Sequence, residues 1–537
     1  MSAILALFAA YFAQGSPAER ADLLIRNARI HTGDPAAPVA RDMAIRGETI
    51  AAVGQDLAAW AGPGTRTIDA GGRTVVPGFI DSHGHVRGLG ESLASLDFKG
   101  SASAEAAAAM VAREAAGRKP GDWIVGRGWD QTRWPGSAFP AADALDRAAP
   151  RNPVYLTRVD GHAAWVNRRA VEASDINAAT PDPAGGRIHR DGKGSATGVL
   201  VDRAMRLVSA RIPAAGPEQI QAFLSRGARE CVRLGLTSVH DAGVGAAEIA
   251  AYEKLIAAGA MPVRIYAMIG GDGELWRSHL KSGPRTGSRL TVRSIKLMAD
   301  GALGSRGAAM KEPYSDDPGN RGLTVTAKQT IERVAKEAVD RGFQVNTHAI
   351  GDRANRDVLD AYAAALGGRN DRRFRVEHAQ VVSLADIPLF ARYSVIASMQ
   401  ATHATSDMRW AEARVGPDRI EGAYAWRRFL DAGVRIANGS DFPVENANPI
   451  EGFHAAVARG GWRLSQRMTR EEALRSFTAD AAYAAFEERV KGRLMPGMLA
   501  DFAILSGDIL SIPEPEIPRV KVLTTVVGGR VEYEARP

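Results

Sequence analysis

The middle of the chain alternates short apolar runs, rich in valine and isoleucine, with alanine-rich segments. Short apolar runs of this kind predict buried strands, and the alanine-rich segments between them predict helices. Eight strands with helices between them predict an α/β fold, a (β/α)₈ TIM-like barrel, rather than an open sheet. The eight runs are Val75–Asp81, Leu236–Asp241, Val263–Ile269, Val292–Ala299, Phe343–His348, Phe374–His378, Val395–Gln400 and Val434–Ser440.

The two ends of the chain have a different pattern, in which short β segments are separated by turns and no long helix is expected. The N-terminal segments are Leu23–Ile30, Asp42–Ile45 and Thr49–Val53, and the C-terminal ones are Ala500–Leu505, Val520–Val527 and Arg530–Tyr533. Because chain termini often lie close together, we expect residues 21–74 and 485–537 to combine into one composite β-sandwich domain.

The spacing of the apolar runs also predicts an insertion. The gap between the first and second barrel strands is far longer than the other gaps. We therefore expect residues 75–94 to hold the first barrel strand, residues 95–217 to form an insertion with its own structure, and residues 218–484 to complete the catalytic barrel.

Composition narrows the class of protein. The 537 residues are 45% hydrophobic and 24% charged, which is ordinary for a globular chain. The net charge of +7 comes from lysines and arginines scattered among acids, so no nucleic-acid partner is expected. The single cysteine, Cys231, excludes an intrachain disulfide. No apolar run reaches the roughly 18 to 20 residues of a membrane span.

The first residues have the pattern of a short export signal. Ser2–Ala13 is apolar and uncharged, and Gln14-Gly15-Ser16 follows. We expect residues 1–20 to act as a signal peptide, which favours a periplasmic or exported protein. The alternative is a frayed N-terminal helix on a cytoplasmic protein, since a positively charged start is missing apart from the amino terminus.

The end of the first barrel strand carries the most informative chemistry. The apolar run there ends in Asp81-Ser82-His83-Gly84-His85. Residues two apart in a strand point to the same side, so His83 and His85 would present two imidazoles together. Two convergent imidazoles suit a divalent metal ion. A turn that happens to hold two histidines is the alternative for this segment alone.

Four further strand ends carry residues of the metal-ligand type: Lys296, His348, His378 and Asp441. Chemistry in such barrels sits at the carboxyl ends of the strands, so their joint occurrence predicts one metal site. Each residue also has a structural alternative when taken alone. These are, in the same order, an ion pair with Asp300, a hydrogen bond to Asp352, an ion pair with Glu377, and a turn or cap position.

Taken together, these segments resemble the metal-dependent amidohydrolase superfamily, and within it the branch that includes N-substituted formamide deformylases. The resemblance covers the chain from Asp22 to about Glu534. The segments that carry it are Gly78–His85, Ile295–Gly301, Thr347–Asp352, Val376–His378, Gly439–Pro443 and Gly492–Phe502. Met399-Gln-Ala-Thr-His403 departs from the family pattern, because Ala401 stands where a proline is usual.

The resemblance implies a divalent metal cofactor, expected to be zinc, with one or two ions per chain. His83 and His85 would hold one ion, and His348 and His378 a second, with Lys296 as a carbamate between them. A neutral lysine amine reacts with carbon dioxide to give such a carbamate, and burial makes the neutral form accessible. Asp441 would bind metal or serve as the catalytic acid–base group beside a metal-activated hydroxide. A single-ion site remains an alternative.

The resemblance also implies a hydrolase that cleaves a C–N bond of a small molecule other than a peptide. Trp129 and His162, in recurring segments of the insertion, and His403 are candidate substrate-binding residues, with loop-shaping as the alternative role for the two histidines. An esterase, lactonase or decarboxylase on the same scaffold is the enzymatic alternative, and a non-catalytic binding protein is a third. A homodimer is left open.

Overall fold

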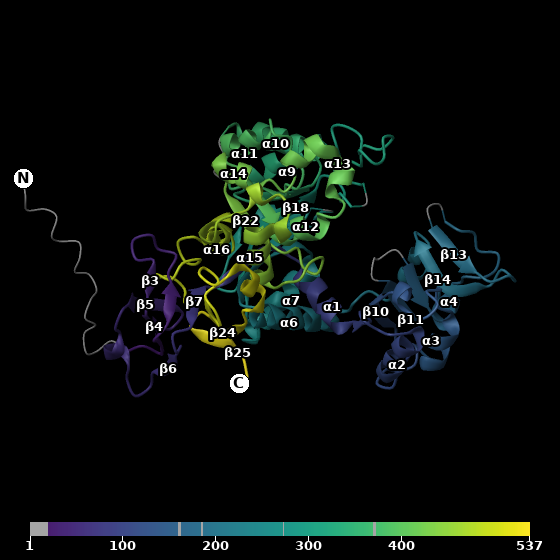
Figure 1. Ribbon diagram of the computed structural model, residues 1–537, viewed down its shortest axis with the longest axis horizontal. Coiled ribbons are helices and arrows are strands. Elements are labelled where there is room, and N and C mark those ends of the chain that lie inside the picture. The colour runs from purple at the N-terminus through teal and green to yellow at the C-terminus, as the bar shows by residue number, and fades with distance from the viewer. Residues whose placement is uncertain are drawn as a thin grey trace, which may run out of the picture. The chain divides into compact units, whose positions relative to one another are not determined.

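The computed structural model describes residues 20–158, 163–183, 186–271, 273–304, 306–368 and 372–536 (Figure 1). The chain forms two compact units. The barrel unit consists of the chain up to Leu89 and from Leu224 onward, and the insertion unit is Gly90–Phe223. The expected signal peptide falls almost entirely outside the described residues.

The barrel unit is built around eight parallel strands, which agree with the eight apolar runs to within a few residues. Their spatial order follows the chain, and each neighbouring pair from β8 to β22 is hydrogen-bonded in parallel. The strands are β8 (Phe79–Gly84), β15 (Leu236–Val244), β16 (Arg264–Gly270), β18 (Leu290–Met298), β19 (Gln344–Ala349), β20 (Arg375–His378), β21 (Ile396–Gln400) and β22 (Ile436–Gly439). The predicted TIM-like barrel is thus confirmed.

The last strand returns to the first at their carboxyl ends. The backbone N–H of Asp441 donates to the carbonyl of His83 at 2.7 Å. The carboxylate of Asp81 accepts from the backbone N–H and the hydroxyl of Ser440 at 3.1 and 2.6 Å. A Cβ atom at Gly439 would lie 2.6 Å from the carboxylate of Asp81, so only glycine allows β22 this close to β8. These contacts nearly close the barrel at the edge that carries the ligand-type residues.

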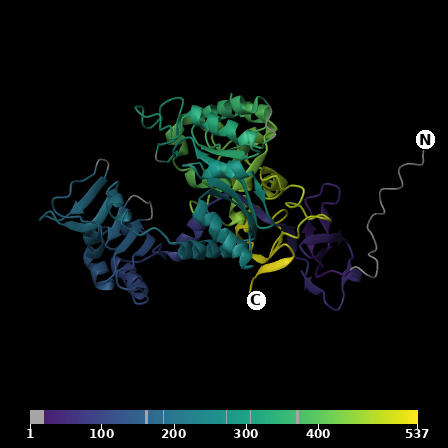
Figure 2. The ribbon, with the colours of Figure 1, turned by 180° about the vertical axis from the view of Figure 1, so that it is seen from behind.

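Helices surround the strands of the barrel (Figures 1 and 2). In α9 the buried residues Ile331, Val334, Ala335 and Ala338 recur every three or four positions, so one face packs inward. The helices with most or all of their length in this unit are α6 (Pro217–Arg233), α7 (Ala246–Ala257), α8 (Leu275–Ser282), α9 (Lys328–Asp340), α10 (Asp352–Leu366), α11 (Ile387–Tyr393), α12 (Ala401–Asp407), α13 (Ala411–Arg419), α14 (Trp426–Asp431), α15 (Pro449–Ala458), α16 (Arg470–Ser476) and α17 (Ala479–Ala484).

Strands from the two chain ends pair in one sheet, with the order β25-β24-β23-β7-β2-β3. Yellow C-terminal strands accordingly lie beside purple N-terminal ones in Figure 2. A second sheet, β5-β4-β1-β6, shares a hydrophobic core with it. The strands are β1 (Leu23–Arg26), β2 (Arg29–His31), β3 (Val39–Ala40), β4 (Asp42–Arg46), β5 (Thr49–Gly54), β6 (Arg66–Asp69), β7 (Thr74–Pro77), β23 (Phe502–Leu505), β24 (Val522–Val527) and β25 (Arg530–Glu534).

The first apolar run serves two sheets, which differs from the single strand predicted for Val75–Asp81. Its first part, β7, pairs with β23 in the terminal sheet, and its second part, β8, begins the barrel. The change of direction falls at Gly78, where a Cβ atom would lie 2.2 Å from the side chain of Thr237. Pro77 and Gly78 therefore mark a change of sheet inside a continuous apolar run.

The insertion unit has its own sheet, in the order β13-β14-β12-β11-β10-β9, and two separate hydrophobic cores. Neighbours such as Tyr155 and Leu156 belong to different cores, as expected for a sheet covered on both faces. Its elements are α1 (Val86–Ala94, shared with the barrel unit), β9 (Leu96–Asp97), α2 (Ala104–Ala115), β10 (Ile124–Trp129), α3 (Ala142–Ala148), β11 (Val154–Arg158), β12 (Ala163–Val166), α4 (Arg168–Ala173), β13 (Gly186–Arg190), β14 (Ala196–Asp202) and α5 (Met205–Ser209). Among the helices described in either unit, none is long and apolar enough to cross a membrane.

Candidate functional site

A cavity of about 420 Å³ lies in the barrel unit and collects all six residues predicted to bind metal. We call it the barrel cavity. Its lining residues are His83, His85, Lys296, Met298, Ala302, Leu303, Gly304, His348, Ile350, His378, Gln380, His403, Asp407, Trp410, Asp441, Val444 and Glu445. The ligand-type residues come from the ends of β8, β18, β19 and β20 and from the turn after β22, as the barrel geometry requires.

Two of these residues face the cavity because of an unusual backbone conformation. His378 has φ of 75° and Asp441 has φ of 59°, in the left-handed region that non-glycine residues seldom adopt. Such conformations cost free energy and cluster at functional sites. At the end of β20, the turn at His378 departs from strand alternation, and both Glu377 and His378 contact the site.

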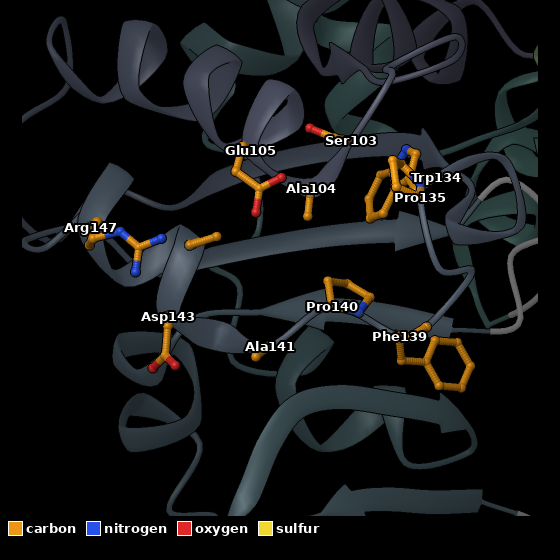
Figure 3. A pocket seen from close by; sticks show the side chains of 12 residues that line it. Ser103, Ala104, Glu105, Trp134, Pro135, Phe139, Pro140, Ala141, Asp143 and Arg147 are labelled. Atoms are coloured by element: carbon orange, nitrogen blue, oxygen red, sulfur yellow. The ribbon is translucent and has the colours of Figure 1, made fainter.

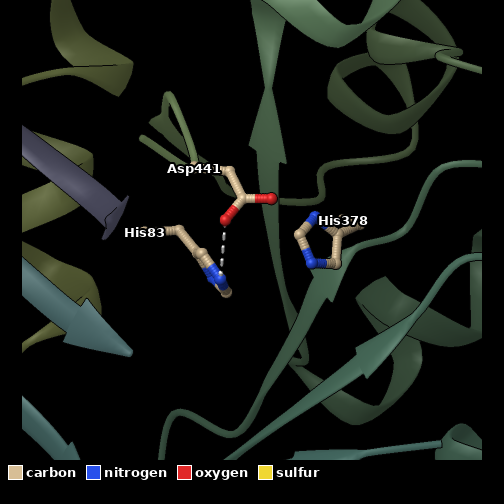
Figure 4. Close-up of side chains that lie close together, drawn as sticks. All are labelled: His83, His378 and Asp441. Atoms are coloured by element: carbon tan, nitrogen blue, oxygen red, sulfur yellow. Dashed lines mark ion pairs between the residues drawn. The ribbon is translucent and has the colours of Figure 1, made fainter. Parts of the chain in front are cut away.

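Three ligand atoms come closest together. Those of His83, His378 and Asp441 lie within 4.8 Å of one another, and all three residues are buried (Figure 4). The carboxylate oxygen Oδ1 of Asp441 is 3.6 Å from Nε2 of His83 and 3.0 Å from Nε2 of His85. Two nitrogen donors and one carboxylate in this space match the donor set of a divalent metal site.

The histidines are oriented by acceptors on their far ring nitrogen. Nδ1 of His83 lies 2.5 Å from a carboxylate oxygen of Glu377, and Nδ1 of His85 lies 2.9 Å from the carbonyl of Ala242. Nδ1 of His378 lies 2.7 Å from Oε1 of Gln400. Because these oxygens accept, each Nδ1 carries a proton. Nε2 of His83 and of His378 keeps its lone pair toward the cavity, whereas Nε2 of His85 faces the carboxylate of Asp441 at 3.0 Å and donates to it. This arrangement is typical of metal-binding histidines.

The protonation states of the central residues fit this role. Burial lowers the pKa of His83 to about 4, with a smaller contribution from the charge of Lys296, and burial also lowers the pKa of His378 well below its usual value. Both imidazoles are therefore neutral near pH 7. Burial alone would raise the pKa of Asp441, but opposing effects, led by the hydrogen bond with His85, outweigh it, so this pKa is well below normal.

Lys296 lies in the cavity without the partner expected from its sequence neighbourhood. Its Nζ is 3.3 Å from Nε2 of His83. Asp300 is instead the acceptor for three backbone N–H groups, those of Ala309, Ile350 and Gly351, at 2.8 to 3.0 Å. Burial lowers the pKa of the Lys296 amine. The ion pair between Lys296 and Asp300, the alternative considered for this lysine, is not found.

His348 lines the cavity but is not part of the closest group. Its ring centroid is 4.6 Å from that of His378. Its buried Nε2 lies 3.4 Å from Oδ1 of Asp300 but has no hydrogen-bond partner. Asp352, the structural partner considered for His348, accepts from the backbone N–H of Lys311 at 2.8 Å. Glu377, considered as a partner of His378, binds His83 and Arg375 instead.

Of the described substrate-binding candidates, His403 lines the barrel cavity and Trp129 does not. His403 lines the cavity, its ring stacks 5.9 Å from that of His378, and its Nε2 is 3.8 Å from Oδ2 of Asp441. Trp129 is fully buried in the core of the insertion unit, where its indole N–H donates to the carbonyl of Leu156 at 2.8 Å. This burial contradicts a ligand contact by Trp129 and gives it a packing role. His162 lies outside the described residues.

The insertion unit has a cavity of its own, of about 400 Å³ (Figure 3). Its lining carries no histidine, and its charged residues lie apart from any group of metal-ligand type found in the described chain. The lining residues are Ser103, Ala104, Glu105, Trp134, Pro135, Ala138, Phe139, Pro140, Ala141, Asp143, Ala144 and Arg147. The chemistry of metal ligation is therefore found in the barrel cavity.

A known family combines these features. Residues 66–533 match the sequence description of the amidohydrolase family. The chain belongs to this family. It is also similar to the Protein LONG AFTER FAR-RED 3 of Arabidopsis thaliana, with 34% identity over 96% of this chain and 92% of that protein. Its identity to the N-substituted formamide deformylase of Arthrobacter pascens is 29%, over 96% of this chain and 98% of that enzyme.

A solved structure supports the same assignment. The crystal structure of an uncharacterized metal-dependent hydrolase from Pyrococcus furiosus superimposes with a TM-score of 0.78 at 30% sequence identity. The match covers 91% of this amidohydrolase and 100% of that chain. The family resemblance inferred from the motifs is thus confirmed, and with it a hydrolase of the amidohydrolase family.

Two groups that support the site were not predicted. Glu377 and Arg375 form a buried ion pair at 2.9 Å beneath His83, and Gln400 anchors His378. Strand alternation gave a partial signal, because Arg375 and Glu377 are two apart and share a face of β20. The partners they meet lie on other strands, so the contact itself was not readable from the local sequence.

Proposed function

We propose that this amidohydrolase cleaves a C–N bond of a small amide or formamide by hydrolysis, with a divalent metal ion as cofactor. The observation that carries the proposal is the convergence of His83, His378 and Asp441 within 4.8 Å at the carboxyl end of the barrel. The similarity to an N-substituted formamide deformylase supports this bond type and this kind of substrate.

The residues in the cavity fit zinc, which favours imidazole nitrogen and carboxylate oxygen. His83, His378 and Asp441 would hold the first ion together with His85, whose Nε2 is 3.0 Å from Oδ1 of Asp441. Two acceptors at that distance need a cation or a proton between them. In a two-ion site, His378 would instead join His348 on the second ion, because its Nδ1 is held by Gln400 and its Nε2 can bind one ion only.

We further propose that Lys296 is carboxylated. Its amine nitrogen would form a bond with the carbon of carbon dioxide and release a proton, giving a carbamate whose oxygens could bridge two ions. The lowered pKa of this buried amine supports the neutral form that the reaction needs. Its position 3.3 Å from Nε2 of His83 brings such a carbamate among the metal ligands.

A divalent ion held here would polarise the substrate carbonyl and make a water molecule more acidic. The proton of that water needs an acceptor, and Oδ2 of Asp441 would serve, because Oδ1 lies toward Nε2 of His83 and His85, where the ion would be held. Asp441 then returns the proton to the departing nitrogen, which leaves as an amine. Nε2 of His403 lies 3.8 Å from Oδ2 and so borders the position of this proton transfer.

The experiment is metal removal followed by reconstitution. Purified protein is assayed for bound zinc and for amine release from a panel of formamides and acetamides, with the corresponding esters as comparison. We expect one to two ions per chain, loss of amine release after chelation, and recovery with zinc. Full activity in a thoroughly demetallated sample would refute the metal requirement, and turnover restricted to esters would refute the bond assignment.

We also propose that the two terminal sheets form a composite β-sandwich domain, as their shared core of Leu23, Ile45, Val75, Phe502 and Val526 supports. The ion pair of Arg264 with Asp501, at 2.8 Å, links this domain to barrel strand β16. Its role would be to support the barrel, since the metal-ligand group lies on barrel strand ends.

A further inference from the structure

Besides the six residues predicted to bind metal, which we call the ligand group, the barrel cavity is lined by apolar side chains. The larger of these are Met298, Leu303, Ile350, Trp410 and Val444. Val444 is 69% exposed and Met298 39%, so apolar surface continues to the mouth of the cavity. A cavity of about 420 Å³ admits a small organic molecule, since ligand sites typically span about 300 to 1,000 Å³.

Trp410 is the largest of these residues, and its position is held from two sides. A Cβ atom at Gly304 would lie 3.3 Å from Cη2 and Cζ2 of the indole, so glycine lets the ring approach the β18–α9 connection. The guanidinium of Arg414 lies 5.6 Å from the ring centroid. Arg414 is itself fixed by Asp316 and the carbonyl of Gly304. The indole therefore offers a pre-positioned aromatic wall, which binds apolar groups at low entropic cost.

Outside the ligand group, the charged side chains that line the cavity are acids. Asp407 and Glu445 line it, and Lys296, within the ligand group, is the one Lys or Arg among its described lining residues. Ser406 donates to Oε1 of Glu445 at 2.5 Å. Oδ2 of Asp407 accepts from Tyr424 and from Gln380, each at 2.7 Å. Neutral donors thus hold both carboxylates in place without cancelling their charge.

The cations nearby are already committed elsewhere. Arg306 and Arg414 both pair with Asp316 rather than extending into the cavity. A substrate with a carboxylate remote from its scissile bond would therefore meet two acids, and among the described lining residues it would find no arginine fork to bind it. A neutral or positively charged group would meet an indole face and two carboxylates, which suits both stacking and cation–π contact.

We propose that the substrate of this site is the acylated derivative of an apolar amine whose remote end is uncharged or cationic, with Trp410 and Glu445 as its specificity-determining residues. This inference rests on the proposed C–N hydrolysis for the identity of the scissile bond. The choice between substrates, by contrast, follows from the cavity wall alone. Trp410 stacks on the apolar part, and Glu445 repels a carboxylate there.

The test uses three N-formylphenethylamines that differ in the para substituent: methyl, carboxylate or trimethylammonium. The zinc-loaded full chain is assayed for amine release, giving kcat and KM for each. Their methanesulfonamide analogues, which cannot be hydrolysed at the same bond, are titrated calorimetrically to give Kd without turnover. Binding and cleavage are thereby measured separately.

For the unmodified protein we expect the carboxylate compound to bind at least about tenfold more weakly than the methyl compound. Glu445→Gln should remove much of this difference, and Glu445→Lys should reverse it. Trp410→Ala should weaken binding of the methyl compound about three- to tenfold, with Trp410→Phe retaining most of it. Glu412→Gln removes an acid close to Trp410 that does not line the cavity, and it should leave the order unchanged.

The results separate the two proposals. If the sulfonamides bind in the expected charge order but no formamide is cleaved, the assignment of the reaction fails and the substrate class stands. If formamides are cleaved with equal KM for all three substituents, or if the carboxylate compound binds best, the substrate class is overturned. Binding that Glu445→Lys and Trp410→Ala leave unchanged overturns the two residue assignments, provided that both variants keep the wild-type melting temperature.

Discussion

Replacing Glu377 by glutamine tests the buried support under the ligand group. Glu377 is fully buried, with Oε2 at 2.5 Å from Nδ1 of His83 and Oε1 at 2.9 Å from Nε of Arg375. Burial alone would raise its pKa, but the charge of Arg375 and the hydrogen bond with His83 outweigh this and hold the pKa at about 2. The side chain is therefore ionised at every pH at which the protein would be assayed.

The expected losses of stability and of zinc affinity follow from the hydrogen bonds that glutamine can make in place of Glu377. Glutamine offers one accepting oxygen and one donating nitrogen, so one of the two N–H groups now facing Glu377 would meet another donor. Arg375, also fully buried, would lose its counter-charge. Breaking a buried pair in this way costs about 3–5 kcal/mol. The loss of the acceptor for His83 should weaken zinc binding by about 10- to 100-fold.

Two measurements on the same variant distinguish stability from positioning. Urea unfolding of the demetallated protein gives the change in unfolding free energy, and competition with a chelator gives the zinc Kd. The double variant Glu377→Gln/Arg375→Met removes both charges, so it should recover about half or more of the lost stability. Its zinc affinity should stay low, because His83 still lacks a carboxylate acceptor.

A surface pair serves as the matched control. Glu332 pairs with Lys336 one helical turn away on α9, at the surface of the barrel unit. Because such surface pairs contribute little, Glu332→Gln should leave the unfolding free energy close to wild type and the zinc Kd unchanged. A wild-type zinc Kd in Glu377→Gln would refute the positioning role. Failure of the double variant to recover any stability would refute the charge-pair explanation.

Three further predictions concern other parts of the chain. Asp441→Asn should retain metal but lower kcat by about 10²- to 10⁴-fold, and near-normal kcat would leave Asp441 as a turn residue only. Lys296→Ala should lose most activity and regain part of it with added short carboxylic acids, whereas a density map with an unmodified amine in an active enzyme would exclude the carbamate. The third prediction concerns Asp508 in the terminal domain. Burial alone would raise the pKa of Asp508, but hydrogen bonds from His31 and Ser511 outweigh it and lower this pKa to about 2. Because this pKa lies below the unfolded value of about 4, Asp508 stabilises the fold above pH 4 and loses this effect as the pH falls toward 2. Urea unfolding at several pH values should therefore show the stability gap between wild type and Asp508→Asn narrowing over that range.

The sequence by itself determined the barrel and the candidate ligands. Eight apolar runs separated by helices admit few other arrangements, and parallel strands bring their carboxyl ends to one edge. Residues at successive strand ends, such as His83, His348 and His378, could therefore be assigned to one site without knowledge of any contact. Local pattern was sufficient here because the barrel itself supplies the long-range geometry.

Other features were decided by tertiary structure alone. The run before Asp81 looked like one strand, but packing of Gly78 against Thr237 divides it between two sheets. Trp129 lies in a recurring segment of the insertion and was a candidate substrate-binding residue, and only the packing of the insertion unit revealed that it is buried.

The contacts that position the ligand group were also decided by tertiary structure. Glu377 meets His83, which is 294 positions away in the chain, and Ser440 meets Asp81 across 359 positions. Contacts between residues so distant leave no periodic trace in the local sequence, because they depend on which strands become neighbours and on the side chains that fill the space between them.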